Sequence, residues 1–222
     1  HDQIRLVVTL GGDHSISLGS VAAALSRRPD TRVLWVDAHA DVNTPETSPS
    51  GNMHGMPLGY LLGYATYDWL PETPLCPSRL AYVGLRDIDR DEKKMLLDLR
   101  RKGAYVSTMR EVDQFGIGKV MEMALESLGY LRGGDEKPPP LHLSFDIDAI
   151  DPQFASATGT VVRGGLSFRE AHYVCEAVWS TGALGSMDIV EVNDTLTDPD
   201  RAKETVDLAA SLVASACGDV IL

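Results

Sequence analysis

Three short apolar runs in this chain each lead directly into a cluster of aspartate and histidine side chains. Residues 6–10 precede GGDHS at 11–15, residues 33–36 precede DAHAD at 37–41, and residues 141–145 precede DID at 146–148. Runs of this length and composition are typical of buried strands, so each cluster is expected where a strand ends. Open α/β sheets bind ligands at the carboxyl edge of their strands. The pattern therefore predicts a largely parallel sheet with a polar site at that edge.

The alternating spacing of these side chains indicates a metal site. Asp37, His39 and Asp41 alternate along the chain, as do Asp146 and Asp148. Carboxylates this close together would repel one another and raise each other's pKa unless a positive charge held them. A single cluster has ordinary explanations, since a lone histidine is more often packed or capping and DxD is common in loops. Three clusters at three strand ends favour one divalent ion or two.

The candidate ligands favour manganese. Two imidazoles and four carboxylates, with no cysteine nearby, form a hard, oxygen-rich set that suits Mn better than Zn, although Zn, Co or Fe could compete by affinity. Asp37 and Asp146 each have a partner two residues away, so either could bridge two ions. Two-metal sites hold their ions about 3.5–4 Å apart and generate hydroxide at neutral pH. The reaction class that this pattern indicates is hydrolysis.

Several segments, these clusters included, resemble a known family. GGDHS, DAHAD and SFDIDAIDP at 144–152 resemble the signature motifs of the ureohydrolases. Segments that resemble arginase in particular are SGNMHG at 50–55, GLRDIDRDE at 84–92, ATGT at 157–160 and DIVEVN at 188–193. The resemblance extends from about the first residue to the last. It implies an arginase-like α/β fold of three layers, with a largely parallel, doubly wound sheet and helices on both faces.

The resemblance implies a cofactor of two Mn ions per chain. A hydroxide that bridges them would attack the guanidinium carbon of L-arginine and yield L-ornithine and urea. Carried over by motif, the ligands of one ion are His14, Asp37, Asp41 and Asp146. Those of the other ion are Asp37, His39, Asp146 and Asp148. All six ligand positions are intact.

Three catalytic residues follow from the same resemblance. Glu191 comes just after the apolar-leaning run of residues 184–190 and would pair with the guanidinium. His54 lies outside the ligand set, and a histidine with a pKa near neutrality suits proton transfer to the departing amine. Asp41, besides its role as a ligand, would accept a hydrogen bond from the bridging hydroxide and orient it.

One loop is matched to the α-carboxylate of the substrate. Asn43, Ser50 and Asn52 fall between Asp41 and Gly55 and resemble the residues that receive this group. Neutral polar donors in this loop favour arginase over an agmatinase, whose substrate has no carboxylate. Without the resemblance, the two asparagines are ordinary loop residues.

Three further residues are matched to the rest of the substrate. Asp89 and Glu92 resemble residues that recognise the α-amino group, directly or through water. Thr160 is matched to a position near the guanidinium or the metal-linked hydrogen bonds. Without the resemblance, Glu92 is a solvated acid in the first turn of a helix.

The rest of the sequence alternates between expected strands and helices. Expected strands cover residues 80–84 and 104–107. Expected helices cover residues 15–26, a segment from near 54, 89–101, 117–131 with its end at 132–135, a segment after 167, and 202–216. Ser167 and Glu170 form a candidate capping box. Alternation of this kind predicts a parallel sheet with crossover helices.

The composition fits one domain over residues 1–222 and excludes several partners. A length of 222 residues with 44% hydrophobic side chains suits a single core. The net charge of −12 argues against a nucleic-acid partner, which would require a basic patch. No apolar stretch approaches the roughly 20 residues that span a bilayer, so no membrane partner is expected. The three widely separated cysteines predict a reducing compartment and hence a cytoplasmic protein.

The resemblance also sets expectations for the start of the chain and for three departures. His1 lies directly before a core strand, so the domain is expected to be truncated, without an N-terminal segment and a sheet strand that the family carries. Any targeting signal would be lost with that segment, which leaves a mitochondrial location open. Ala149, Val161 and Arg163 replace residues common in arginases, and Arg163 is expected to alter the mouth of the pocket.

The resemblance implies an oligomeric state, and three alternative activities are compared with arginase. The resemblance implies a homo-oligomer, a trimer, with Arg169 and Glu170 as candidates for ion pairs between subunits; an exposed pair contributes only about 0–1 kcal/mol. An agmatinase, or another ureohydrolase of guanidino acids, would share every metal ligand. A deacetylase-like hydrolase with one zinc would need only one Asp-His-Asp set. A catalytically silent metal-binding homologue would be expected to lack Glu191 or His54, and both are present.

Overall fold

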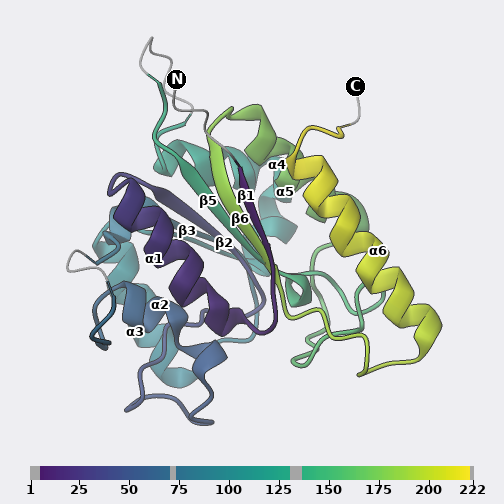
Figure 1. The fold of residues 1–222 in the computed structure, drawn as a ribbon, viewed down its shortest axis with the longest axis horizontal. Helices are drawn as coiled ribbons and strands as arrows, with labels where there is room; N and C mark the ends of the chain where they lie inside the picture. Colours follow the sequence, from purple (N-terminus) through teal and green to yellow (C-terminus); the bar gives the residue numbers. More distant parts are fainter. Residues whose placement is uncertain (1–5, 71–73, 131–136, 221–222) are drawn as a thin grey trace.

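A parallel six-stranded sheet forms the centre of the computed structural model, which describes residues 6–70, 74–130 and 137–220 (Figure 1). The strands follow the order β1-β6-β5-β2-β3-β4, and every neighbouring pair is parallel. They are β1 Val7–Leu10, β2 Arg32–Val36, β3 Leu80–Leu85, β4 Tyr105–Thr108, β5 Leu141–Asp146 and β6 Leu184–Val190. The strands expected from the sequence are therefore confirmed, with small shifts at their ends.

Helices cover both faces of this sheet. They are α1 Ser17–Arg27, α2 Pro57–Leu61, α3 Arg90–Arg101, α4 Met109–Ser127, α5 Phe168–Ser180 and α6 Pro199–Ala216. Figure 1 shows α1, α2 and α3 on one side of the sheet and α4, α5 and α6 on the other. The three-layer, doubly wound α/β fold expected from the sequence is confirmed.

The alternating residues of β2 explain how the three layers are held together. Val33 and Trp35 pack in a core cluster with residues of α1, α2 and α3, whereas Leu34 and Val36 pack in a cluster with residues of α4, α5 and α6. All four side chains are fully buried. Successive side chains of a strand point to opposite faces of the sheet, so a strand covered on both faces is apolar throughout.

Capping boxes begin three of the described helices, α3, α4 and α5. Ser167 and Glu170 form the expected capping box at the start of α5. The helix expected from residue 117 is confirmed, because α4 is broken at Gly116, whose φ is 75°, and its second stretch follows that break. The first stretch, which begins at Met109 with a capping box of Thr108 and Glu111, was not revealed by the apolar periodicity. The end expected for this helix, at residues 132–135, lies outside the described residues.

The segment around His54 is less helical than expected. It forms a 3-10 turn, Met53–Gly55, and only then the short helix α2. Within residues 6–70, 74–130 and 137–220, no helix is long and apolar enough to cross a membrane.

Candidate active site

The acidic clusters meet where the strand order of the sheet reverses. β2 and β5 are neighbours, with Val36 opposite Phe145. The chain continues from β2 to β3 and β4 on one side, and from β5 to β6 on the other. Crevices beyond the carboxyl ends of strands at such a switch point are where open α/β sheets bind ligands. Because Asp37 follows β2 and Asp146 ends β5, the fold itself brings these two carboxylates together.

His14 lies at the centre of the first cluster. Its Nδ1 atom is 3.0 Å from Asp37 Oδ2, 3.0 Å from Asp41 Oδ2 and 3.2 Å from Asp146 Oδ2. That nitrogen is buried and has no hydrogen-bond partner among the described residues, whereas Nε2 lies 2.9 Å from Ser144 Oγ. Donation from Nε2 would leave the Nδ1 lone pair facing three carboxylate oxygens. Such a lone pair has no favourable contact until a cation lies between these atoms.

His39 and Asp148 form a second cluster that shares Asp37 with the first. His39 Nδ1 lies 3.1 Å from Asp148 Oδ2 and 3.5 Å from Asp37 Oδ1. Thr160 Oγ1 donates to the same Asp148 oxygen over 2.8 Å. The ligand atoms lie within 4.8 Å of one another in each of two sets, His14 with Asp37 and Asp41, and Asp37 with His39 and Asp148. Asp37 offers a different oxygen to each set, as a carboxylate that bridges two ions would.

Burial shifts the pKa values of these carboxyl groups. It raises the pKa of Asp41 to about 7. Burial and the charges of neighbouring carboxylates raise the pKa of Asp146 well above its usual range, and they also raise that of Asp148. Burial acts in the same direction on Asp37, but its close contacts with the imidazoles of His14 and His39 outweigh it and lower the pKa of Asp37. The cluster therefore needs added positive charge to be fully ionised at neutral pH, and divalent cations would supply it.

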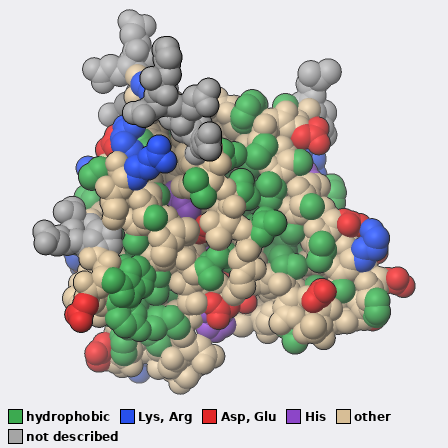
Figure 2. Space-filling view, in the orientation of Figure 1, with side chains coloured by type: hydrophobic (Ala, Val, Ile, Leu, Met, Phe, Trp, Pro, Cys, Tyr) green, Lys and Arg blue, Asp and Glu red, His purple; other side chains and the backbone are tan. Residues whose placement is uncertain are grey.

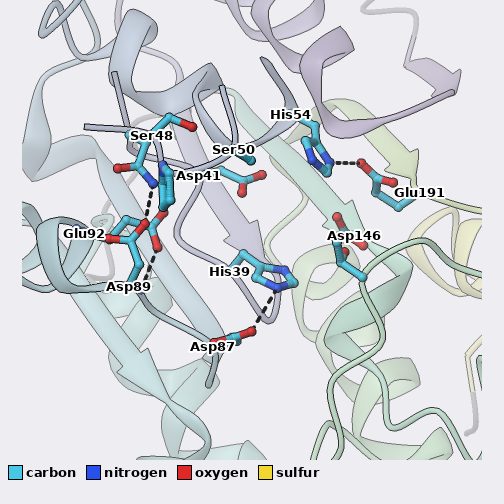
Figure 3. Close-up of a pocket in the computed structure, with 14 residues that line it drawn as sticks. His39, Asp41, Ser48, Ser50, His54, Asp87, Asp89, Glu92, Asp146 and Glu191 are labelled. Atoms are coloured by element: carbon cyan, nitrogen blue, oxygen red, sulfur yellow. Dashed lines mark hydrogen bonds and ion pairs between the residues drawn. The ribbon is translucent and has the colours of Figure 1, made fainter. Parts of the chain in front are cut away.

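A cavity of about 190 Å³ lies beside the two clusters (Figure 3). Ten residues predicted from the sequence line it: His39, Asp41, Asn43, Ser50, His54, Asp89, Glu92, Asp146, Thr160 and Glu191. His14, Asp37 and Asp148 are buried outside this lining, and Asn52 is exposed outside it. In the space-filling view, acidic and histidine side chains gather at the lower part of the molecule, beyond the carboxyl ends of the strands (Figure 2).

Glu191 follows β6 and points toward His54 (Figure 3). Its Oε1 atom accepts the backbone N–H of His14 over 2.8 Å and lies 3.1 Å from His54 Nδ1. The hydrogen bond with Glu191 raises the pKa of His54. Among the described non-glycine residues, Glu191 and Asp41 have positive φ angles, 63° and 50°. Left-handed backbone costs such residues roughly 1–2 kcal/mol, and strain of this kind is concentrated at functional sites.

The loop that follows Asp41 satisfies its polar groups internally. Asn43 Nδ2 donates to Asp89 Oδ2 over 2.7 Å, and Asn43 Oδ1 accepts from Thr47 Oγ1 over 2.8 Å. Ser50 Oγ accepts the backbone N–H of Asn52 over 3.1 Å. The side chains predicted to receive an α-carboxylate are thus in place at one end of the cavity, except that of Asn52.

Glu92 is 5% exposed, so its interpretation as a solvated acid is wrong. Its Oε2 accepts the backbone N–H of Asp89 in the capping box that begins α3, and its Oε1 lies 3.4 Å from the backbone nitrogen of Val42. Burial raises the pKa of Glu92 to about 7. The buried carboxyl group therefore lies in the inner wall of the cavity.

Comparison with known proteins identifies the family of this chain. The sequence matches the arginase family over residues 1–218. This chain belongs to the arginase family. It is 49% identical to the arginase of Coccidioides posadasii (strain C735), over 98% of this chain and 68% of that protein. It is 48% identical to an arginase of Schizosaccharomyces pombe (strain 972 / ATCC 24843), over 100% of this chain and 67% of that protein.

Solved arginases share the fold. The arginase of Bacillus caldovelox matches with a TM-score of 0.86 and 38% identity, over 98% of this chain and 70% of that chain. The cold-adapted arginase of the yeast Glaciozyma antarctica matches with a TM-score of 0.80 and 44% identity, over 97% of this chain and 71% of that chain. The Entamoeba histolytica arginase, solved in complex with L-ornithine, matches with a TM-score of 0.83 and 33% identity, over 97% of this chain and 71% of that chain. This chain thus spans roughly two thirds of the length of the relatives it matches.

Membership of the arginase family places the chain among the metal-dependent amidinohydrolases. It confirms the resemblance carried by the GGDHS, DAHAD and SFDIDAIDP motifs. It also decides against the deacetylase-like alternative.

Three residues of this arginase-family site were not expected from the sequence. Ser48 and Asp87 line the cavity, and Asp87 Oδ2 lies 3.8 Å from His39 Nε2. Trp35 donates its Nε1–H to Asp37 Oδ2 over 2.9 Å and stacks on the histidine of the first cluster, with ring centroids 4.0 Å apart. Asp87 comes two residues after β3 ends, so the rule that placed the other acids would have found it. Trp35 looks like an ordinary core residue in the sequence.

Proposed function

We propose that this chain is a two-manganese hydrolase that cleaves the guanidinium group of L-arginine to give L-ornithine and urea. The observation that carries the proposal is the pair of His-Asp clusters that share Asp37 and lie beside a polar cavity. The names of the relatives and the solved complex with L-ornithine support the choice of substrate.

The six predicted ligands would hold two ions. His14, Asp37, Asp41 and Asp146 would bind one, and Asp37, His39, Asp146 and Asp148 the other. The donor set is rich in carboxylate oxygen, which favours Mn over softer ions. When bound, the ions would lower the pKa of a coordinated water and so supply a nucleophile at neutral pH.

Glu191 would orient the guanidinium beside the metal centre. One carboxylate oxygen, Oε1, is already held by the backbone N–H of His14 and by His54. The other, Oε2, accepts no hydrogen bond from the described residues, so it is free for a guanidinium N–H. A charge-assisted bond of this kind also fixes the plane of the guanidinium.

His54 would carry the proton that the departing amine needs. Its hydrogen bond with Glu191 raises the pKa of its imidazole, which favours the protonated form near neutral pH. A protonated imidazole that lines the cavity can donate to a leaving amine. Asp41 faces the same space and would accept a hydrogen bond from the attacking water.

The far end of the cavity suits the amino-acid part of L-arginine. Figure 3 shows Asp89, Glu92 and Ser48 at one end and Glu191, His54 and Asp146 at the other. An extended substrate with its guanidinium at the metal end would place its α-ammonium near Asp89 and Glu92. Its α-carboxylate would meet the loop of Asn43, Ser50 and Asn52, and Thr160 would border the guanidinium.

The direct test is urea release from L-arginine and from agmatine, with and without added Mn. We expect Mn-dependent urea from L-arginine and far less from agmatine, because unpaired polar groups reject an analogue strongly. Equal kcat/KM for the two substrates would leave an amidinohydrolase of the agmatinase kind. No urea from either substrate, or from other guanidino acids, would favour a catalytically silent metal-binding homologue.

We propose a homotrimer in the cytoplasm, with no membrane or nucleic-acid partner; a mitochondrial location stays open. Arg169 pairs with Glu176 of its own chain and Glu170 accepts the backbone N–H of Ser167, so neither depends on a second subunit for a partner. Light scattering at micromolar concentration should show a trimer, and a monomer would contradict the proposed assembly.

A further inference from the structure

Arg86 lies just after β3, and its guanidinium donates to an unusual number of backbone carbonyls. Nη2 donates to Asp148 O over 2.6 Å and to Val162 O over 2.7 Å, and Nη1 donates to Ala149 O over 3.1 Å. Longer contacts of 3.3–3.4 Å join Nε to Val162 O, Nη2 to Ile150 O and Nη1 to Gly84 O. One side chain therefore ties together the end of β3, the turn that carries Asp148, and the loop after Thr160.

The charge of this guanidinium has no single carboxylate partner. Within the described part of the chain, no Asp or Glu oxygen lies within 4.0 Å of the Arg86 nitrogens. Its strongest charge interactions are instead with carboxylates of the clusters, Asp148 and Asp37 first. Arg86 is therefore a permanent cation beside the acidic clusters, and it is held by carbonyl oxygens alone.

Asp148 is the ligand that these contacts position. Its carbonyl oxygen is held by Arg86, while its Oδ2 accepts from Thr160 Oγ1 over 2.8 Å and its Oδ1 accepts the backbone N–H of Ala38 over 3.2 Å. Arg86 also holds Val162 O, in the segment that carries Thr160. The same guanidinium thus contacts the main chain of Asp148 and the segment whose hydroxyl hydrogen-bonds to the Asp148 carboxylate.

We propose that Arg86 is a positioning residue for the ion bound by His39 and Asp148. Its planar fork holds several oxygens at once, which the single ammonium of a lysine cannot do. The inference rests on the proposed two-metal function, and it predicts that the fork supports one ion more than the other. His14 and Asp41, the two ligands that only the other ion would use, lie outside the segments that Arg86 joins.

The test is calorimetric titration of Mn into the metal-free full chain and its variants. Arg86→Lys keeps the charge and loses the fork, and Arg86→Gln loses both. The matched control is Arg100→Lys, because Arg100 also donates to a backbone carbonyl, Val106 O over 2.6 Å, but lies at the far end of α3 from Asp89. Urea unfolding of each metal-free variant is measured alongside.

We expect two Mn ions in the parent chain and in Arg100→Lys. Arg86→Lys should lower the affinity for one ion by about 10-fold to 100-fold, the usual loss when a partner that supports a ligand is removed. The affinity for the other ion should stay close to that of the parent chain. Arg86→Gln should lower the affinity for the first of these ions further. Metal-free Arg86→Lys should unfold at a urea concentration close to that of Arg100→Lys.

Four results would overturn the inference. Unchanged affinities, or equal losses at both ions, would remove the positioning role. A metal-free Arg86→Lys chain that is already unfolded would make Arg86 a residue of general stability. A parent chain that binds fewer than two Mn ions would contradict the proposed metal centre, and this inference with it; the parent titration thus separates the two failures.

Discussion

The ligand clusters and the loop of residues 43–55 border the same cavity, but they differ in whether their polar atoms have hydrogen-bond partners. In the first cluster, His14 Nδ1 has no hydrogen bond although three carboxylate oxygens lie within 3.2 Å. In the loop, the amide group of Asn43 is paired on both sides, with Asp89 and Thr47. The first cluster is incomplete without a cation, whereas Asn43 has its hydrogen bonds without a ligand.

This difference indicates how each region should respond to change. Removing a shared ligand should disrupt both ions, because each shared carboxylate belongs to both proposed ligand sets. The loop must exchange internal hydrogen bonds for bonds to the substrate, so its substitutions should alter selectivity more than folding. The predictions below test that contrast.

The largest expected effect is that of Asp146→Ala. Both proposed ions use this carboxylate, and the metal centre contributes several kcal/mol to the rate, so urea formation should fall more than about 1,000-fold. Elemental analysis should find metal lost from both positions. The control is Asp207→Ala, which removes an exposed acid that pairs with Lys203 on α6. Two tightly bound Mn ions in Asp146→Ala would contradict the shared-ligand assignment.

His54→Ala should lower kcat by about 100-fold or more, because a positioned acid or base contributes that much. Added imidazole should restore part of the rate if His54 carries a proton. Metal content should stay at the parent value, since His54 is outside both clusters. His172→Ala is the control, since this histidine bonds to Phe168 O within α5. A variant with normal turnover would leave His54 without a proton-transfer role.

Asn43→Ala should separate the two substrates. We expect kcat/KM for L-arginine to fall about 10-fold to 100-fold, the cost of one unpaired polar contact, and that for agmatine to change little. Asn52→Ala should lower kcat/KM for L-arginine less than Asn43→Ala does, because Asn52 is exposed outside the cavity lining. Equal losses for both substrates would show that this loop does not read the α-carboxylate.

The smallest expected effect concerns the pH dependence of folding at Glu92. Burial raises its folded pKa to about 7 from a usual value of 4.5, so the folded chain binds this proton more tightly than the unfolded chain. The stability it contributes is present at pH 4.5 and is lost as the pH rises toward 7. In the metal-free chain, Glu92→Gln should therefore reduce the fall in unfolding free energy between pH 5 and 7 by about 1–2 kcal/mol.

The matched control for this titration is Glu170→Gln, which changes the corresponding position of the capping box on α5. Glutamine retains a capping box, so neither variant should lose its helix. Urea unfolding at both pH values measures the difference. A pH dependence equal to the parent in Glu92→Gln would show that Glu92 is not the group that titrates.

The ligand clusters could be predicted from the sequence because parallel strands place their carboxyl ends at one edge. An apolar run followed by acids therefore predicts where those acids lie in the fold. The alternation of such runs with expected helices predicts the three-layer fold. Asp87 obeys this rule but was passed over. The 3-10 turn at His54 escaped because Asn52, its N-cap residue, makes no side-chain cap that a sequence pattern could show. The stretch of α4 before Gly116 escaped because a polar capping box, not apolar periodicity, begins it.

The substrate loop could not be predicted from residue pattern alone. Asn43 and Ser50 are ordinary loop residues until the fold turns them toward the cavity, and only the resemblance to arginase singled them out. The same holds for Arg86, whose partners are backbone carbonyls. A carbonyl acceptor exists at every residue, so a sequence carries no signal for such contacts.

The central claim is that two ions share Asp37 and Asp146, and electron paramagnetic resonance of the Mn-loaded chain tests it most directly. Ions that share bridging carboxylates lie about 3.5–4 Å apart and couple magnetically. We predict two bound Mn per chain and the broad spectrum of a coupled pair. Two independent six-line signals, or a single bound Mn at saturation, would contradict the account.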